Sequence, residues 1–239
     1  MCGLLSLVVA GCGTQATAEP ERSTDEILSD VARALGKVRS YHVEGESVDE
    51  DGRGQFEGDV TASGSMRFSV RVGDARARMV IAGSTSFLNA NGQFWRTQSR
   101  APEATARLLS DRWVKVPPGG QNPLGNMAPE TVAYCLTHDI GTVVVKGRQR
   151  FAGQDVVVLT DRGDKPGTAP GDLYVGESGL PLRVVQTGPR RPGTHDARCG
   201  DADGTTTESD IRLSAFDEPV EITAPPGALD LSRGNGTNA

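Results

Sequence analysis

The chain has few aromatic residues, few cysteines and no long apolar run. Aromatic residues make up 5% of its 239 residues, so a core has to be built from Val, Leu, Ile and Ala. The apolar stretch from Leu4 to Gly11 has fewer than half of the roughly 20 residues that a membrane-spanning helix needs. None of the four cysteines belongs to a C-x-x-C or a Cys/His spacing, which disfavours a zinc site.

Reactive constellations are scarce as well. The chain has no G-x-S-x-G or H-E-x-x-H motif and no Gly-rich phosphate loop. We expect each of the three histidines, His42, His138 and His195, to face solvent or cap a turn rather than act as a base. The stretch "DADGTTTESD" resembles a calcium loop, but Gly204 stands two places early, so we interpret it as an acidic turn. The sequence therefore predicts no catalytic residues, no metal and no cofactor.

The N-terminal apolar run ends at the quartet "VAGC", residues 9–12, which resembles a bacterial lipobox. The run is long enough for the apolar core of a secretory signal. We expect residues 1–11 to be a signal peptide, Cys12 to carry the lipid, and residues 12–22 to be a tether on the extracytoplasmic side of the cell membrane. Residues 1–3 supply no Lys or Arg, so we expect the natural start to lie upstream. The alternative is a buried or disordered N-terminus with an incidental cysteine.

Two cysteines remain once Cys2 is removed with the signal and Cys12 is lipidated. In an exported, oxidising setting this remaining pair, Cys135 and Cys199, predicts a disulfide.

The net charge of −6 is unevenly distributed. Residues 64–120 hold 3 acids and 9 bases, and four of the bases, Arg67, Arg71, Arg76 and Arg78, occupy alternating strand positions rather than a cluster. This spacing disfavours nucleic acid as a partner. Two interpretations stay open: a solvated sheet face, or attraction to anionic headgroups of a membrane.

Local patterns indicate mixed α and β structure. Ser23 and Glu26 have the spacing of a capping box, and a stripe of apolar residues follows them, which predicts a helix. From Ser40 onward the apolar period changes to two, the pattern of strands with one buried face. Asn91-Gly92 predicts a tight hairpin between two short strands. A helix is expected around residue 103, and another begins at Pro129.

We expect about ten or eleven strands joined as consecutive hairpins. An antiparallel sheet with one apolar face has to cover that face. The predicted fold is α+β, a strongly curved antiparallel half-barrel with helices covering its concave face. It forms one domain over residues 23–231, followed by a flexible tail over 232–239.

Several stretches together resemble the LppX/LprAFG family of actinobacterial lipoproteins, whose fold is similar to that of the lipoprotein-localisation carriers. They are the lipobox, "ALGKVRSYHVEG", "MRFSVRVG", "ARARMVIAG", "SFLNANGQFWR", "DRWVKVP", "YVGESGLPLRVVQTG" and "FDEPVEITAPPGALDL". The resemblance implies a membrane-anchored protein that binds a lipid or glycolipid between sheet and helices, as a carrier or chaperone. The rival function is an envelope sensory or protein-interaction module on the same fold, with a protein partner. We expect a monomer.

The expected cavity lining consists of apolar residues on two strands and one helix. They are Met66, Phe68, Val70, Val72, Met79, Ile81, Val31 and Leu35. The alternative is that the same residues form an ordinary filled core.

Overall fold

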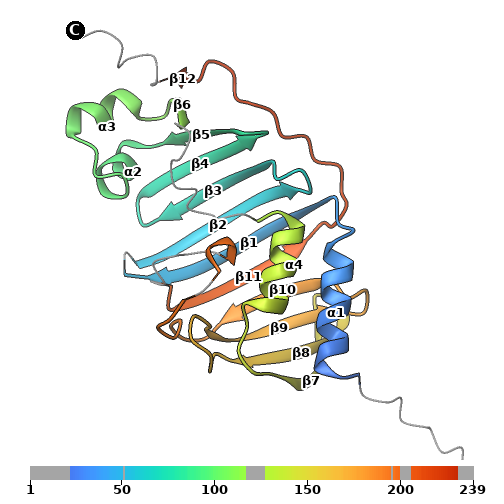
Figure 1. Ribbon diagram of the computed structural model, residues 1–239. Coiled ribbons are helices and arrows are strands. Elements are labelled where there is room, and N and C mark those ends of the chain that lie inside the picture. The colour runs from blue at the N-terminus through green and yellow to red at the C-terminus, as the bar shows by residue number, and fades with distance from the viewer. Residues whose placement is uncertain (1–21, 51, 117–126, 195, 200–205, 231–239) are drawn as a thin grey trace, which may run out of the picture.

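The computed structural model describes residues 22–50, 52–116, 127–194, 196–199 and 206–230. Across these residues a single sheet of twelve strands carries four α-helices on one face (Figure 1). The helices are α1 (Thr24–Leu35), α2 (Gly92–Thr97), α3 (Glu103–Leu109) and α4 (Pro129–His138). The strands are β1 (Ser40–Asp49), β2 (Gly52–Thr61), β3 (Met66–Val72), β4 (Ala75–Ala82), β5 (Thr85–Ala90), β6 (Trp113–Val116), β7 (Val143–Phe151), β8 (Gln154–Arg162), β9 (Pro170–Gly176), β10 (Pro181–Gln186), β11 (Glu208–Ser214) and β12 (Leu229–Asp230).

The strand order across the sheet is β12-β6-β5-β4-β3-β2-β1-β11-β10-β9-β8-β7. All neighbours are antiparallel except β12 and β6, which are parallel. The predicted α+β class and antiparallel sheet are therefore confirmed. The sheet has one strand more than the ten or eleven that we expected.

The strong curvature that we expected is not found: the sheet is open, with β12 and β7 as its edges (Figure 1). Sharp bending needs bulges or kinks within strands. The register shifts lie at Pro181/Arg183 and Val145/Gly147, near one end of the sheet. The central strands β1 to β4 pair in unbroken register.

Two helices begin where the sequence placed them. At the start of α1 the amide of Glu26 donates to Ser23 Oγ at 3.3 Å, and the amide of Ser23 donates to the Glu26 carboxylate at 2.8 Å. This is the predicted capping box. Pro129 is the first residue of α4, where its missing N–H leaves no hydrogen bond unmade.

The predicted hairpin at Asn91-Gly92 is wrong, because α2 begins there. The Oδ1 of Asn91 accepts from the amide of Phe94 at 2.9 Å, so Asn91 is the N-cap of α2. The same oxygen accepts from the Arg76 amide at 3.1 Å, and Nδ2 donates to the Asp74 carbonyl at 2.8 Å. An asparagine suits both a hairpin turn and a helix cap, and here contacts with the β3–β4 turn favour the cap.

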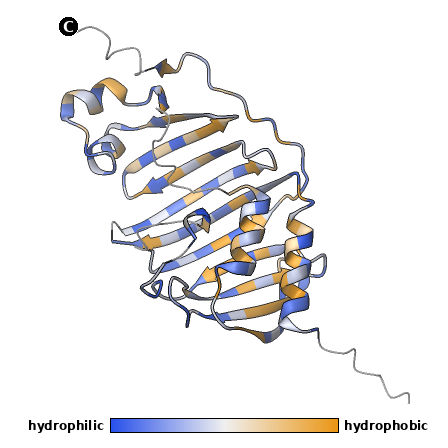
Figure 2. Cartoon of the chain, in the orientation of Figure 1, coloured by the Kyte–Doolittle hydropathy of each residue, from blue (hydrophilic) through white to orange (hydrophobic). Residues whose placement is uncertain are grey.

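The apolar residues fall into three clusters, and the strands alternate between hydrophobic and hydrophilic positions (Figure 2). The largest cluster lies between the sheet and the helices α1 and α4. A second lies under α2 and α3 near β4 to β6, on the same sheet face. The third, around Val156, Val158 and Leu182, lies on the opposite face at β8 to β10.

Candidate functional site

Helices α1 and α4 lie side by side over one half of the sheet (Figure 1). Their apolar faces are buried against it. Ile27, Val31 and Leu35 of α1 are at most 2% exposed, because they follow one another on a single stripe of the helix. Ala133 of α4 joins the same cluster, with Val132 and Leu136 packed beside it. The helix pair therefore forms an apolar layer above the sheet.

The residues that we predicted as cavity lining all belong to this layer or to the sheet face below it. Val31, Leu35, Met66 and Phe68 are buried in the largest cluster, and Ile81 packs against it. Cross-strand register puts the rest on the same face, since Phe68 pairs with Met79 and Val70 with Ala77. Met79 is buried, whereas Val70, Val72 and Ile81 are partly exposed.

The apolar face continues beyond α1 and α4 toward the second helix pair. Trp95 and Leu109, from α2 and α3, cover Ala77, Ala90 and Val114 there. Between the two covered regions the sheet presents partly buried apolar side chains. These are Phe56, Val70, Ile81 and Leu88.

At two glycines the apolar sheet face lacks a side chain, and a neighbouring ring fills the space. A Cβ at Gly58 would lie 2.6 Å from the Phe68 ring, and one at Gly45 would lie 3.0 Å from the Phe56 ring. Each ring thus occupies the space above a glycine on the neighbouring strand. The sequence pattern of alternation did not reveal these ring positions, because they depend on the register between strands.

Tyr41 places a hydroxyl group within the apolar layer. The sequence analysis did not select this residue. Its side chain is fully buried, and the hydroxyl donates to the Met127 carbonyl at 2.6 Å. Burial raises the pKa of Tyr41 far above its ordinary value, so the phenol stays neutral and remains a donor. This bond fixes the segment just before α4 to the central strand β1.

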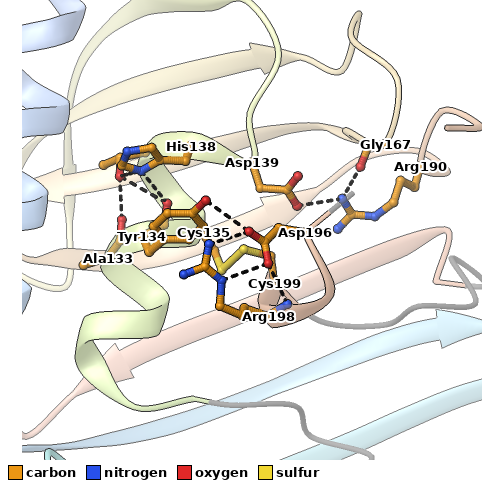
Figure 3. The surroundings of a disulfide bond; sticks show 11 residues. Ala133, Tyr134, Cys135, His138, Asp139, Gly167, Arg190, Asp196, Arg198 and Cys199 are labelled. Carbon is orange, nitrogen blue, oxygen red and sulfur yellow. Dashed lines mark hydrogen bonds and ion pairs between the residues drawn. A yellow bond between two sulfur atoms is a disulfide. The ribbon is translucent and has the colours of Figure 1, made fainter. Parts of the chain in front are cut away.

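The predicted disulfide between Cys135 and Cys199 is confirmed, and it joins α4 to the segment between β10 and β11 (Figure 3). The Tyr134 ring contacts two other groups. It stacks on the His138 ring, with the ring centroids 4.4 Å apart, and the Arg198 guanidinium carbon lies 3.9 Å from its centroid. The Tyr134 hydroxyl also donates to Asp196 at 3.0 Å. Arg198 binds Asp196 through a salt bridge of 2.6 Å.

A second anchor lies at the C-terminal end of α4. Arg190 contacts Asp139 at 3.2 Å and donates to the Gly167 carbonyl (Figure 3). Both charged side chains of this pair are mostly buried. The C-terminal half of α4 is thus tied to the loop that follows β10.

The histidines do not form a catalytic arrangement in the described residues. His42 contacts Asp59 at 2.8 Å, and Arg67 donates to the same carboxylate at 2.6 Å. Partial burial raises the pKa of Asp59, but the hydrogen bonds from His42 and Arg67 outweigh it, and the pKa lies below its ordinary value. His138 is held in the Tyr134 stack, and His195 lies outside the described residues.

Metal and membrane signatures give the following results for the described residues. No group of three or more His, Cys, Asp and Glu side chains there is arranged to hold an ion. No helix among them is long and apolar enough to cross a membrane. The predicted signal peptide, Cys12, most of the tether, Gly204 in the acidic turn and the tail over 232–239 lie outside the described residues.

Four arginines of the basic segment lie on the sheet face that points away from the helices, namely Arg67, Arg71, Arg76 and Arg78. Our expectation that they do not cluster is wrong. Residues 73–74 turn the chain so tightly that β4 folds back on β3, which places Arg71 directly opposite Arg76. Arg78 is two residues along β4 on the same face. Spacing along the chain could not show this, because the neighbours come from two strands.

No protein-family model and no curated protein matches the chain. Solved structures do share its fold. LprF from Mycobacterium bovis matches with 14% identity and a TM-score of 0.53, over 85% of this chain and 97% of LprF. The Mycobacterium tuberculosis lipoprotein LppX matches with 12% identity and a TM-score of 0.49, over 84% of this chain and all of LppX (100%).

MucB in the Pseudomonas aeruginosa complex of MucA and MucB is similar over 85% of this chain and 67% of that chain, with 14% identity and a TM-score of 0.41. The match to LprF confirms, for the fold, the resemblance that the sequence indicated. At such low identity the likeness establishes the fold and assigns no ligand.

Proposed function

We propose that the protein is a membrane-anchored, exported lipoprotein that binds a lipid or another hydrophobic ligand between its sheet and helices, as a carrier or chaperone. The LprF-like fold supports a lipoprotein, and the "VAGC" quartet supports a lipid at Cys12. The anchor would hold one domain, residues 23–231, on the extracytoplasmic side of the cell membrane.

The observation that carries the proposal is a continuous apolar sheet face that two separate helix pairs cover. A filled core under one continuous helix layer would bury this face evenly. Here Phe56, Val70, Ile81 and Leu88 remain partly exposed between the two covered regions. An acyl chain placed over these side chains would remove their apolar surface from water, at about 25 cal/mol per Å² buried.

The ligand would extend from this exposed strip toward the α1–α4 layer. The predicted lining residues Met66 and Phe68 share one buried cluster with Val31 and Leu35 of that layer. Entry would require α1 or α4 to shift, because these four side chains are buried without a ligand.

The direct test is mass spectrometry of organic extracts from the purified full chain. A co-purifying lipid at a fixed ratio to protein supports the proposal. Absence of lipid, together with no binding of a fluorescent fatty acid, contradicts it.

A matched pair of variants locates the site. Ile81 faces the helices, while its neighbour Val80 faces the opposite side of the sheet, and both are partly exposed. We expect Ile81→Trp to fill the apolar strip and weaken fatty-acid binding about tenfold, a loss of 1.4 kcal/mol. Val80→Trp should leave binding unchanged. Equal effects of the two variants would place the ligand elsewhere.

The anchor is tested separately. Cys12→Ser should move the protein from the membrane fraction into the medium or periplasm. Continued membrane association of this variant would contradict the lipidation of Cys12 without affecting the ligand proposal.

A second candidate function is the envelope protein-interaction module, and the free edge at β7 favours it. Val145 on this strand is 44% exposed, and Arg148 and Arg150 are exposed beside it. An extended segment of a partner could add a strand here. Photo-crosslinking from Val145 to one envelope protein, with no crosslink from the more exposed Leu108 on α3, would support it. No crosslink from Val145 would contradict it.

A further inference from the structure

A groove of about 960 Å³ crosses the sheet on the face away from the helices. It passes over β11, β1, β2, β3, β4 and β5, between two rows of polar side chains. One row contains Asp210, Glu46, Gln55, Arg71, Arg76 and Asn91, and the other contains Arg212, Glu44, Glu57, Ser69, Arg78 and Asn89. The proposed hydrophobic ligand would lie on the other side of the sheet, so this groove is a separate feature.

Like charges face each other at two places in the groove, although Arg212 also lies against Glu44 at 3.9 Å and Asp111 lines the groove as well. Glu44 pairs directly with Glu57 across β1 and β2, and Arg71 pairs directly with Arg76 across β3 and β4. Like charges that face each other across strands are destabilising. Opposite charges at Arg71 and Arg76 would have removed this cost. The end of the groove that carries Arg71, Arg76 and Arg78, here called the basic end, therefore has the composition of a binding surface for an anion.

Other arginines on this face already have carboxylate partners. Arg67 binds Asp59 and Arg183 binds Asp210, each at 2.6 Å. In the described part of the chain, Arg71, Arg76 and Arg78 form no such ion pair. The Arg78 guanidinium instead donates to Asn89 Oδ1 at 3.2 Å and lies over the Trp113 ring at 5.5 Å.

Asn89 supplies an independent indication of a missing acceptor. It is 6% exposed and lines the groove. Arg78 can only donate, so the oxygen of the Asn89 amide faces Arg78 and Nδ2 points elsewhere. Within the described residues Nδ2 donates to no acceptor. A buried donor without a partner costs free energy, and an anion in the groove would accept from it.

We propose that the basic end of the groove binds a compact oxyanion of the phosphate class. The guanidiniums of Arg71, Arg76 and Arg78 offer paired N–H donors that match phosphate oxygens, and Ser69 and Asn89 add neutral donors. The acidic pair Glu44–Glu57 begins one strand from this site, because Glu57 on β2 lies directly opposite Ser69 on β3. These carboxylates would oppose a large anionic surface, whereas a compact phosphate group centred between β3 and β4 needs to contact only the arginines, Ser69 and Asn89.

The test is a titration of the purified full chain with inorganic phosphate, followed by thermal unfolding and by Trp fluorescence, to which Trp113 beside Arg78 contributes. We expect saturable binding and a melting temperature that rises with phosphate concentration. Arg71→Gln and Arg76→Gln should each weaken binding about tenfold. Without phosphate these variants should melt no lower than the parent, because each removes a repulsive pair.

Arg148→Gln is the matched control, since it removes the same charge from an exposed position on β7 at the far edge of the sheet. It should not change phosphate binding. Flotation with phosphatidylcholine vesicles, with and without phosphatidic acid, separates a lipid headgroup from a free phosphate. Binding that requires the vesicle and is lost in Arg71→Gln supports a headgroup.

Three results would overturn the proposal: no saturable binding of phosphate in either form, unchanged binding in Arg71→Gln and Arg76→Gln, or an equal loss in Arg148→Gln. These outcomes are independent of lipid extraction and of Ile81→Trp, which test the opposite face. Failure of one proposal therefore leaves the other intact.

Discussion

Removing the disulfide should destabilise the protein mainly through its unfolded state. Cys135 and Cys199 are separated by 64 residues. The chain-entropy model assigns a loop of this length about 4 kcal/mol of stabilisation, because the link restricts the unfolded chain. For a domain of this size, that corresponds to a fall in melting temperature of about 8–16 °C.

The folded state should change much less. The Tyr134–Asp196 hydrogen bond and the Arg198 contact with the Tyr134 ring do not need the sulfur atoms. They should keep the loop on α4 in the variant Cys135→Ser/Cys199→Ser. The loss of stability should therefore come with a larger urea m-value, since the unlinked chain exposes more surface on unfolding.

Urea and thermal unfolding followed by circular dichroism measure both quantities, with and without a reductant. The reductant should lower the midpoint of the parent and leave the double variant unchanged. Cys12→Ser, which removes a cysteine outside the pair, is the control and should behave as the parent does. A parent whose midpoint does not respond to reduction would refute the reasoning.

Three further changes test the core and the ion pairs. Leu35→Ala should lower the free energy of unfolding by about 2–5 kcal/mol, since this side chain of α1 is fully buried. A smaller loss in urea unfolding would mean that the core closes over the gap. Tyr41→Phe leaves the Met127 carbonyl without its donor and should cost about 1–3 kcal/mol by the same measurement, with no loss if water replaces the hydroxyl. Hydrogen bonds from Arg183 hold the pKa of Asp210 below its ordinary value, so its contribution to stability is present above about pH 4 and disappears as the pH falls through the lowered pKa. The difference in unfolding free energy between the parent and Asp210→Asn should shrink over that window, and a constant difference would contradict this assignment.

Features encoded by neighbouring residues could be predicted from the sequence. The capping box at Ser23 and the proline at the start of α4 act within one turn of helix, so their residues stand close in the chain. Alternation in "MRFSVRVG" and "ARARMVIAG" identified the apolar face of β3 and β4, because a strand turns its side chains to opposite faces with a period of two. The cysteine pair followed from elimination of the other two cysteines.

Features that depend on strand register could not be predicted. The opposition of Arg71 and Arg76 and the ring of Phe68 above Gly58 arise only once β2, β3 and β4 are aligned. The hydrogen bond from Tyr41 to Met127 joins distant segments in the same way. The hairpin prediction at Asn91 was wrong for a different reason. One asparagine side chain suits two local motifs, a hairpin turn and a helix cap, and only tertiary contacts decide between them.

The position of β1 in the middle of the sheet sets the order in which the protein can fold. Its two neighbours are β2, which follows at once, and β11, which comes near the end of the described chain. During synthesis one edge of β1 therefore stays unpaired until almost every other strand has been made. Such long-range pairing slows folding. A chain that folds slowly stays unfolded for longer, which would suit the export across a membrane that we propose.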